Sequence, residues 1–149
     1  MNNYLTTVRY AQTQPDGMSK TITEQYFVFD AANFAEAENL TYKKVAGDGD
    51  NIDVTAIKRT NISEVIKRAD DSYSDDDKWY KAKLTFITLN EVTGKERKVT
   101  VNYLVIAQDI SIARNRIVDF MRGSISDYEI STLDETKIVS VLYTNLAGE

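Results

Sequence analysis

Apolar and polar residues alternate in four long stretches of the chain, and this period of two predicts β-strands. The stretches are residues 4–12, 20–29, 79–89 and 97–106. Between the first two stand Pro15, Asp16 and Gly17, and between the last two stands Gly94. Pro and Gly favour tight turns, because one fixes φ and the other tolerates positive φ. Each pair of stretches is therefore predicted to form a hairpin.

A helical pattern follows each hairpin. Asn33 begins the first helix, with Glu36 three residues later as in a capping box, and Gly47 ends it. Asp109 begins the second helix, whose apolar residues recur at helical spacing up to Arg122. Further strands are expected at 52–59 and 62–66 in the first half, and near 127–133 and 137–143 in the second. Each half is thus predicted to have the order β-β-α-β-β.

The two halves are copies of one another, displaced by about 76 residues, so that Tyr4 aligns with Tyr80 and Val54 with Ile130. A chain of 149 residues has the length of one domain, and each half alone is marginal for burying a core. We therefore expect a single compact domain over residues 1–149. Its two repeats, about 3–68 and 79–144, are joined by an Asp-rich linker, 69–78. The expected fold class is α+β, with antiparallel sheets and two helices packed on one face in pseudo-twofold arrangement.

Composition argues against an enzyme. The sequence contains no cysteine and no histidine, which excludes thiol nucleophiles, imidazole bases and the usual zinc sites. It also lacks the glycine-rich phosphate-binding motifs and the nucleophile elbow. A carboxylate-only enzyme stays open as a third alternative, although no pair of carboxylates has a spacing that marks an acid–base couple. We expect no catalysis, no cofactor and no metal site.

Hydropathy and charge bound the location and the partners. No apolar stretch approaches the roughly 20 residues that span a membrane, and the N-terminus lacks the pattern of a secretory signal. A cytoplasmic protein without a membrane partner is therefore expected. The formal charge of −5 equals the charge of the five aspartates between Asp70 and Asp77, so the rest of the chain is balanced. This acidic total argues against broad binding of polyanions, but a ligand meets the local field.

One strand combines aromatic and basic residues and is the first candidate site. Alternation places Trp79, Lys81 and Lys83 on one face of this strand. An aromatic ring flanked by lysines on an open sheet face is typical of single-stranded nucleic-acid binding. The same pattern is also typical of an edge strand protected by charged side chains. In the binding interpretation, Trp79 and Tyr10 stack on bases, and the contacts to phosphate come from Arg9, Lys58, Arg59, Lys81 and Lys83.

The copies differ most clearly in charge at one pair of positions. Lys58 and Arg59 of the first half align with Asp134 and Glu135 of the second half. Three interpretations stay open. Both pairs are simply solvated strand ends, or the basic pair of one molecule meets the acidic pair of another in head-to-tail self-association, or the basic pair alone contacts phosphate.

Four segments are distinctive: Asp77 to Leu89, Thr93 to Glu96, Ile57 to Ile62 and Ser126 to Ile130. They resemble an uncharacterised domain-of-unknown-function family of gut Bacteroidota and their crAss-like phages. The resemblance covers nearly the whole chain and implies a small phage protein of the DNA-replication neighbourhood, in the host cytoplasm. We therefore predict a non-catalytic single-stranded DNA-binding protein of phage replication or recombination. The alternative is a virion component, or an inhibitor of a host system, that assembles through the charge-complementary strand ends.

Overall fold

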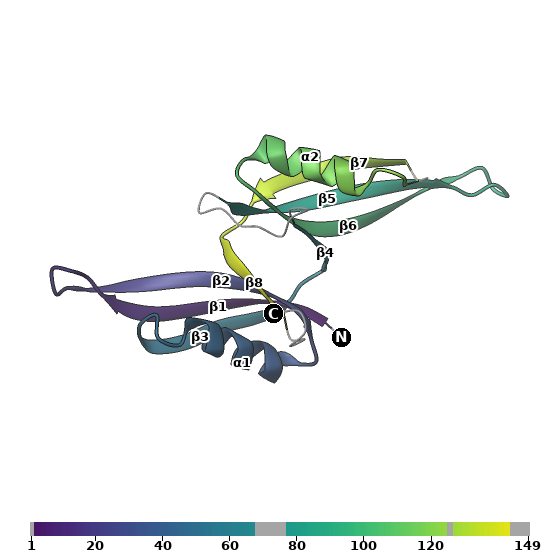
Figure 1. Cartoon of the computed structure of the whole chain (residues 1–149). Helices are drawn as coiled ribbons and strands as arrows, with labels where there is room; N and C mark the ends of the chain where they lie inside the picture. Colours follow the sequence, from purple (N-terminus) through teal and green to yellow (C-terminus); the bar gives the residue numbers. More distant parts are fainter. Residues whose placement is uncertain (1, 68–76, 125–126, 144–149) are drawn as a thin grey trace. The chain divides into compact units, whose positions relative to one another are not determined.

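The computed structural model describes residues 2–67, 77–124 and 127–143, which form an α+β fold as predicted. The elements in chain order are β1 (Asn2–Thr13), β2 (Ser19–Ala31), α1 (Phe34–Val45), β3 (Asp50–Arg59), β4 (Ile62–Ile66), β5 (Lys78–Leu89), β6 (Glu96–Ala107), α2 (Ile110–Phe120), β7 (Asp127–Glu135) and β8 (Ile138–Tyr143). Each half therefore has the predicted order β-β-α-β-β (Figure 1). The predicted acidic linker, 69–78, lies mostly outside the described residues.

The last strand of each half belongs to the sheet of the other half. One sheet has the strand order β3-β1-β2-β8, and the other has the order β4-β6-β5-β7. Two compact units result, which we call unit 1 (Met1–Thr60 with Lys137–Glu149) and unit 2 (Asn61–Thr136). The sequence repeats and the compact units are therefore different divisions of the chain. The single compact domain expected from the sequence stays a prediction.

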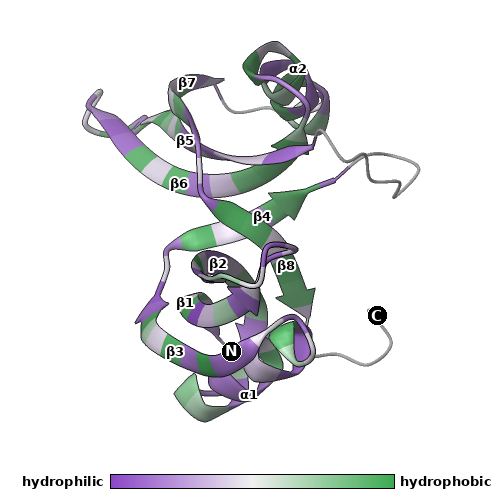
Figure 2. Cartoon of the chain, turned by 90° about the vertical axis from the view of Figure 1, so that its left-hand side faces the viewer, coloured by the Kyte–Doolittle hydropathy of each residue, from purple (hydrophilic) through white to green (hydrophobic). Residues whose placement is uncertain are grey.

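The exchanged strands make both sheets mixed, whereas antiparallel sheets were expected. The hairpin pairs β1–β2 and β5–β6 are antiparallel, as are β1–β3 and β5–β7. In contrast, β8 runs parallel to β2, and β4 runs parallel to β6. Figure 2 shows both exchanged strands largely in the colour of apolar residues. An apolar pattern predicts that such a strand is buried, but it does not predict which strand becomes its neighbour.

Each unit buries a core between its helix and one face of its sheet (Figure 1). In unit 1 the buried core residues are Tyr4, Val8, Tyr10, Tyr26, Val28, Ala31, Ala37 and Val45. In unit 2 they are Ile66, Tyr80, Ala82, Leu84, Val105, Ala107, Ala113, Ile117 and Met121. Each exchanged strand contributes to the core of the unit that it joins. Ile66 of β4 lies in the core of unit 2, and Leu142 of β8 packs against the core of unit 1.

The helices begin where the sequence predicted. The Asn33 side chain accepts the N–H of Glu36 at 2.9 Å, and the Asp109 side chain accepts the N–H of Ile112 at 2.9 Å. Each cap satisfies a backbone donor that the first turn of a helix leaves unpaired. The second helix ends at Phe120, with Met121 as its C-cap, slightly before the predicted end at Arg122. These caps define the residue at which each helix begins.

Candidate functional site

The lysines of β5 lie on the face of the unit 2 sheet that points away from α2. Tyr80, Ala82 and Leu84 share the core with residues of α2, so alternation places Lys81 and Lys83 on the opposite face. Both lysines are exposed. Lys98 of β6 joins them on this face, because it is the register partner of Ile87 on β5. We call this surface, defined by Lys81, Lys83 and Lys98, the lysine face.

Acidic residues of β7 border the lysine face. Asp134 is the register partner of Lys81, and Asp127 is the partner of Ile87. Lys83, by contrast, lies between the uncharged residues Asn102 and Thr132. The exposed cations of this face are thus Lys81 and Lys83 on β5 and Lys98 on β6, and its carboxylates lie on β7. Leu104 and Asn102, the β6 partners of Lys81 and Lys83, are buried.

The predicted stacking residues are buried. The exposed fraction is 4% for Trp79 and 6% for Tyr10. The Tyr10 hydroxyl donates to Glu24 Oε1 at 2.9 Å, and burial together with this carboxylate raises the pKa of Tyr10 to about 12. The Tyr26 hydroxyl donates to the same oxygen at 3.0 Å, and burial raises its pKa as well. Buried rings offer no open face to a base, so Trp79 and Tyr10 are left out of the interface proposed below.

The structure divides the predicted basic residues of unit 1 between the two faces of its sheet. Lys58 and Arg59 are neighbours on β3, so their side chains point to opposite faces of the sheet. The guanidinium carbon of Arg59 lies 5.8 Å from the centroid of the Phe34 ring, a cation–π contact at the start of α1. Arg9 is exposed on β1, where its register partner on β3 is Asp53. Arg59 therefore lies on the α1 side of the sheet, whereas Lys58, the register partner of Leu5, lies on the same face as Arg9.

The charge-inverted pairs occupy equivalent places in the two units. Lys58 and Arg59 end β3, while Asp134 and Glu135 end β7, and both strands are edge strands. Glu135 Oε1 lies 3.4 Å from the Nζ of Lys78, and both side chains are about half exposed. An exposed ion pair of this kind contributes only about 0–1 kcal/mol, so it leaves the acidic strand end accessible to a partner.

Equivalent hydrogen bonds hold the two strand ends. The N–H of Thr60 donates to the carbonyl of Asn3 at 2.9 Å, and the N–H of Thr136 donates to the carbonyl of Trp79 at 2.9 Å. The backbone therefore ends β3 and β7 in the same way, and the two ends differ mainly in the charge of their side chains.

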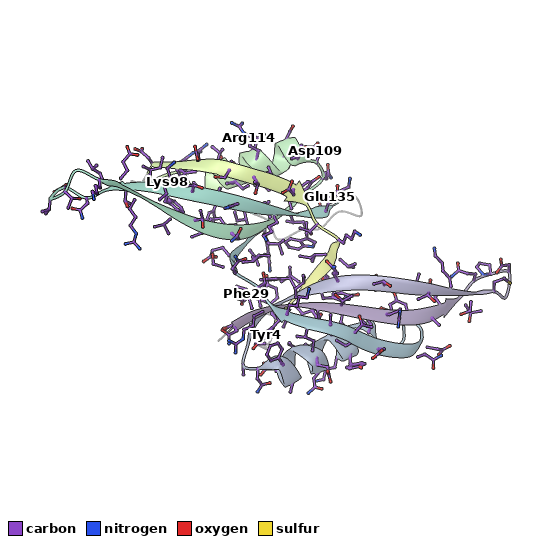
Figure 3. The ribbon with its side chains drawn as sticks, turned by 180° about the vertical axis from the view of Figure 1, so that it is seen from behind. Tyr4, Phe29, Lys98, Asp109, Arg114 and Glu135 are labelled. Carbon is purple, nitrogen blue, oxygen red and sulfur yellow. The ribbon has the colours of Figure 1, made fainter. Side chains whose placement is uncertain are left out.

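A groove between α2 and β7 was not singled out from the sequence. It encloses about 310 Å³ and is lined by Arg114, Val118, Tyr128, Glu129 and Ile130. Arg114 lies on α2 (Figure 3). The repeat offered one signal for it, because Val118 aligns with Tyr42, a much larger residue of a different kind.

Within residues 2–67, 77–124 and 127–143, no group of three or more His, Cys, Asp or Glu side chains is placed to hold a metal ion. In the same ranges, no helix is long and apolar enough to cross a membrane.

The fold defines an α+β protein whose two repeats exchange their last strands, with a lysine face, two oppositely charged strand ends and a groove between α2 and β7. The chain belongs to the family of the domain of unknown function DUF4494, which matches residues 2–144. The match confirms the resemblance to a domain-of-unknown-function family over almost the whole chain. No curated protein matches this chain.

Proposed function

We propose that the protein is a non-catalytic single-stranded DNA-binding protein and that the lysine face of unit 2 contacts phosphates. The placement of Lys81 and Lys83 carries the proposal, because both are exposed on the same face of β5, away from α2. Same-face neighbours on a strand lie about 6.6–6.8 Å apart, so both ammonium groups can meet one nucleic-acid backbone. Phage replication or recombination is the setting that the family resemblance implies.

The charge distribution suggests a path for the bound strand. Lys98 continues the positive charge onto β6, and the exposed Thr100 beside it offers a hydroxyl to phosphate or sugar oxygens. Phosphates would be repelled by the carboxylates of β7, beginning with Asp134 next to Lys81. The proposed path therefore runs along β5 past Lys81 and Lys83 and on to Lys98 of β6. Because the buried aromatic rings do not contribute, binding should be mainly electrostatic and strongly dependent on salt.

A titration of fluorescently labelled oligo-dT, followed by anisotropy at several salt concentrations, tests this proposal. The variant Lys81→Glu/Lys83→Glu should lower the affinity at least about tenfold at low salt. It should also reduce the slope of log K against log salt by roughly 1.4, because each contact to a single strand contributes about 0.7. The control Lys43→Glu/Lys44→Glu makes the same change of net charge at exposed positions of α1 and should have a much smaller effect.

Two outcomes would reject the DNA-binding proposal. One is the absence of binding at tens of micromolar protein in low salt, since nonspecific dissociation constants of DNA-binding proteins are about 1–100 μM. The other is an equal loss of affinity in the α1 control, which would mean that net charge matters and the lysine face does not.

The strand ends favour a second candidate function, a structural or protein-interaction module that assembles with copies of itself. The supporting observation is that β3 and β7 are both edge strands and end in opposite charges. Contacts between different surfaces of identical molecules build rings or filaments. The basic end of one molecule would then meet the acidic end of the next.

Size-exclusion chromatography with light scattering tests self-association. Lys58→Glu/Arg59→Glu should dissociate the assembly through like-charge repulsion. Adding Asp134→Lys/Glu135→Lys to the same chain should restore it, because the complementarity is then reversed at both ends. A monomer in the wild type and in both variants would exclude assembly by this route.

A further inference from the structure

The two units differ in the space between the helix and the edge strand of the sheet. In unit 1, Tyr42 of α1 reaches the edge strand β3, where its hydroxyl accepts the N–H of Val54 at 3.3 Å. The repeat aligns Tyr42 with Val118 and Val54 with Ile130. Unit 2 therefore has a valine at the position from which a tyrosine bridges helix and strand in unit 1.

The groove of unit 2 lies at this equivalent place. Val118 and Ile130 both line the cavity of about 310 Å³ between α2 and β7. This volume is at the lower end of the range for ligand pockets, which is about 300–1,000 Å³. Tyr128 adds an aromatic ring and Arg114 adds a cation to the lining. The groove thus combines apolar side chains with Glu129 and with a guanidinium that can stack on an inserted aromatic ring.

The strand beside the groove is open to pairing. β7 is the terminal strand in the order β4-β6-β5-β7, and an edge strand presents backbone N–H and C=O groups that a further strand can pair with. Extended peptides bind proteins by this kind of strand addition. β7 is strongly acidic, since it carries four carboxylates in nine residues: Asp127, Glu129, Asp134 and Glu135. Charge complementarity therefore favours a basic segment along it.

We propose that the groove between α2 and β7 binds an aromatic side chain presented by an extended, basic segment of a partner protein, which adds to the edge of β7. The aromatic ring would take the place that Tyr42 holds in unit 1, between Val118 and Ile130. A phenol hydroxyl would accept the N–H of Ile130, as Tyr42 accepts that of Val54. Lysine or arginine residues flanking the ring would pair with the carboxylates of β7. The groove itself lies on the α2 side of the sheet, whereas the proposed DNA contacts lie on the lysine face.

The internal repeat supplies the decisive variant. Val118→Tyr gives α2 the tyrosine that α1 has, so the groove is closed by the chain itself. Random nonapeptides displayed on phage are selected for binding to the full-length protein. The affinity of the enriched peptides is then measured for the wild type and for Val118→Tyr. We expect the enriched peptides to share a Tyr or Phe flanked by Lys or Arg. Their affinity for Val118→Tyr should be at least tenfold weaker.

Three controls locate the binding. Tyr42→Val changes the equivalent position of unit 1 and should leave the peptide affinity unchanged. Val118→Ala keeps the groove open and should retain binding, which separates blockage from a general loss of folding. Amide chemical shifts on addition of peptide should move at Ile130 and Thr132. Val118→Tyr should bind oligo-dT with the same affinity as the wild type. The experiment therefore tests peptide binding in the groove independently of DNA binding on the lysine face.

The proposal is overturned by any of three results. The first is that the library shows no enrichment of peptides over beads without protein. The second is that the enriched peptides bind Val118→Tyr as tightly as they bind the wild type. The third is that the shifted amides lie outside α2 and β7.

Discussion

Thr6 donates its hydroxyl hydrogen to the hydroxyl oxygen of Thr41, at 2.8 Å, where both residues are 0% exposed. The direction follows from the neighbouring bond, because Thr41 uses its own hydrogen to donate to the carbonyl of Ala37 at 2.9 Å. The repeat aligns this pair with Ala82 and Ile117, which are both buried in the core of unit 2. The two units therefore make the same contact between sheet and helix with different chemistry.

The first prediction is that Thr6 and Thr41 are energetically coupled. Thr41→Ile alone should lower the free energy of unfolding by about 1–3 kcal/mol, because it leaves the buried Thr6 hydroxyl without its acceptor. Thr6→Ala alone should cost about 1 kcal/mol, since one hydrogen bond is lost. The double variant reproduces the apolar pair of unit 2 and should be nearly as stable as the wild type. Urea unfolding of the four proteins measures the cycle, and additive effects would contradict the prediction.

The second prediction concerns the exchanged strands. Ile66 belongs to the first repeat but is 5% exposed in the core of unit 2, so Ile66→Ala should destabilise unit 2 by about 2–5 kcal/mol. Leu142 belongs to the second repeat but packs against the core of unit 1, so Leu142→Ala should destabilise unit 1, by less because it is only partly buried. Each substitution should therefore act on the unit built mainly from the other repeat.

Amide hydrogen exchange distinguishes the two units in this experiment. Ile66→Ala should speed exchange in α2 and β6, while Leu142→Ala should speed it in α1 and β2. The pattern would be reversed if each repeat folded with its own last strand. Such a reversal would disprove the exchange of strands.

The third prediction is a loss of stability at alkaline pH through Tyr10. Its pKa is raised from 10.0 to about 12 by burial and by the Glu24 carboxylate, so between about pH 10 and 12 the folded state binds more protons than the unfolded state. The stabilising contribution is therefore complete below about pH 10 and is lost as the pH rises towards 12. The pKa of Tyr26 is also raised, by burial and by the same Glu24 carboxylate.

Tyr10→Phe tests this pH dependence, since the repeat-equivalent residue in unit 2 is Phe86. The urea midpoint of the variant should fall less steeply than that of the wild type between pH 10 and 11. All other ionisable side chains are the same in both proteins, so their contributions cancel in the comparison. Parallel curves for the two proteins would refute the role of Tyr10.

The fourth prediction is that Tyr4→Phe does not destabilise the protein. The Tyr4 hydroxyl is buried without a hydrogen-bond partner among the described residues, although its ring packs at 4.9 Å from the ring of Phe34. Removing the hydroxyl keeps the ring contact and removes the cost of burying an unpaired polar group. The free energy of unfolding should rise by about 1 kcal/mol. A clear decrease in thermal or urea unfolding would show that the hydroxyl has a stabilising contact.

The candidate interface could be predicted only in part. Alternation along β5 correctly placed Lys81 and Lys83 on one face, because the direction of side chains in a strand is a local property. The burial of Trp79 on the same strand could not be read from that pattern, since exposure depends on contacts that are distant in sequence. The groove at Val118 was also missed, because it arises from a small residue on a helix next to an edge strand.

The sequence by itself determined the elements of this protein, because hairpin turns, helix caps and apolar periodicity act over a few residues. Asn33 and Asp109 marked the two helix starts, and the repeat fixed the order β-β-α-β-β in both halves. Only the tertiary structure decided that β4 and β8 change places. An apolar strand gains the same burial beside either sheet, and the choice depends on which long-range pairing completes both cores.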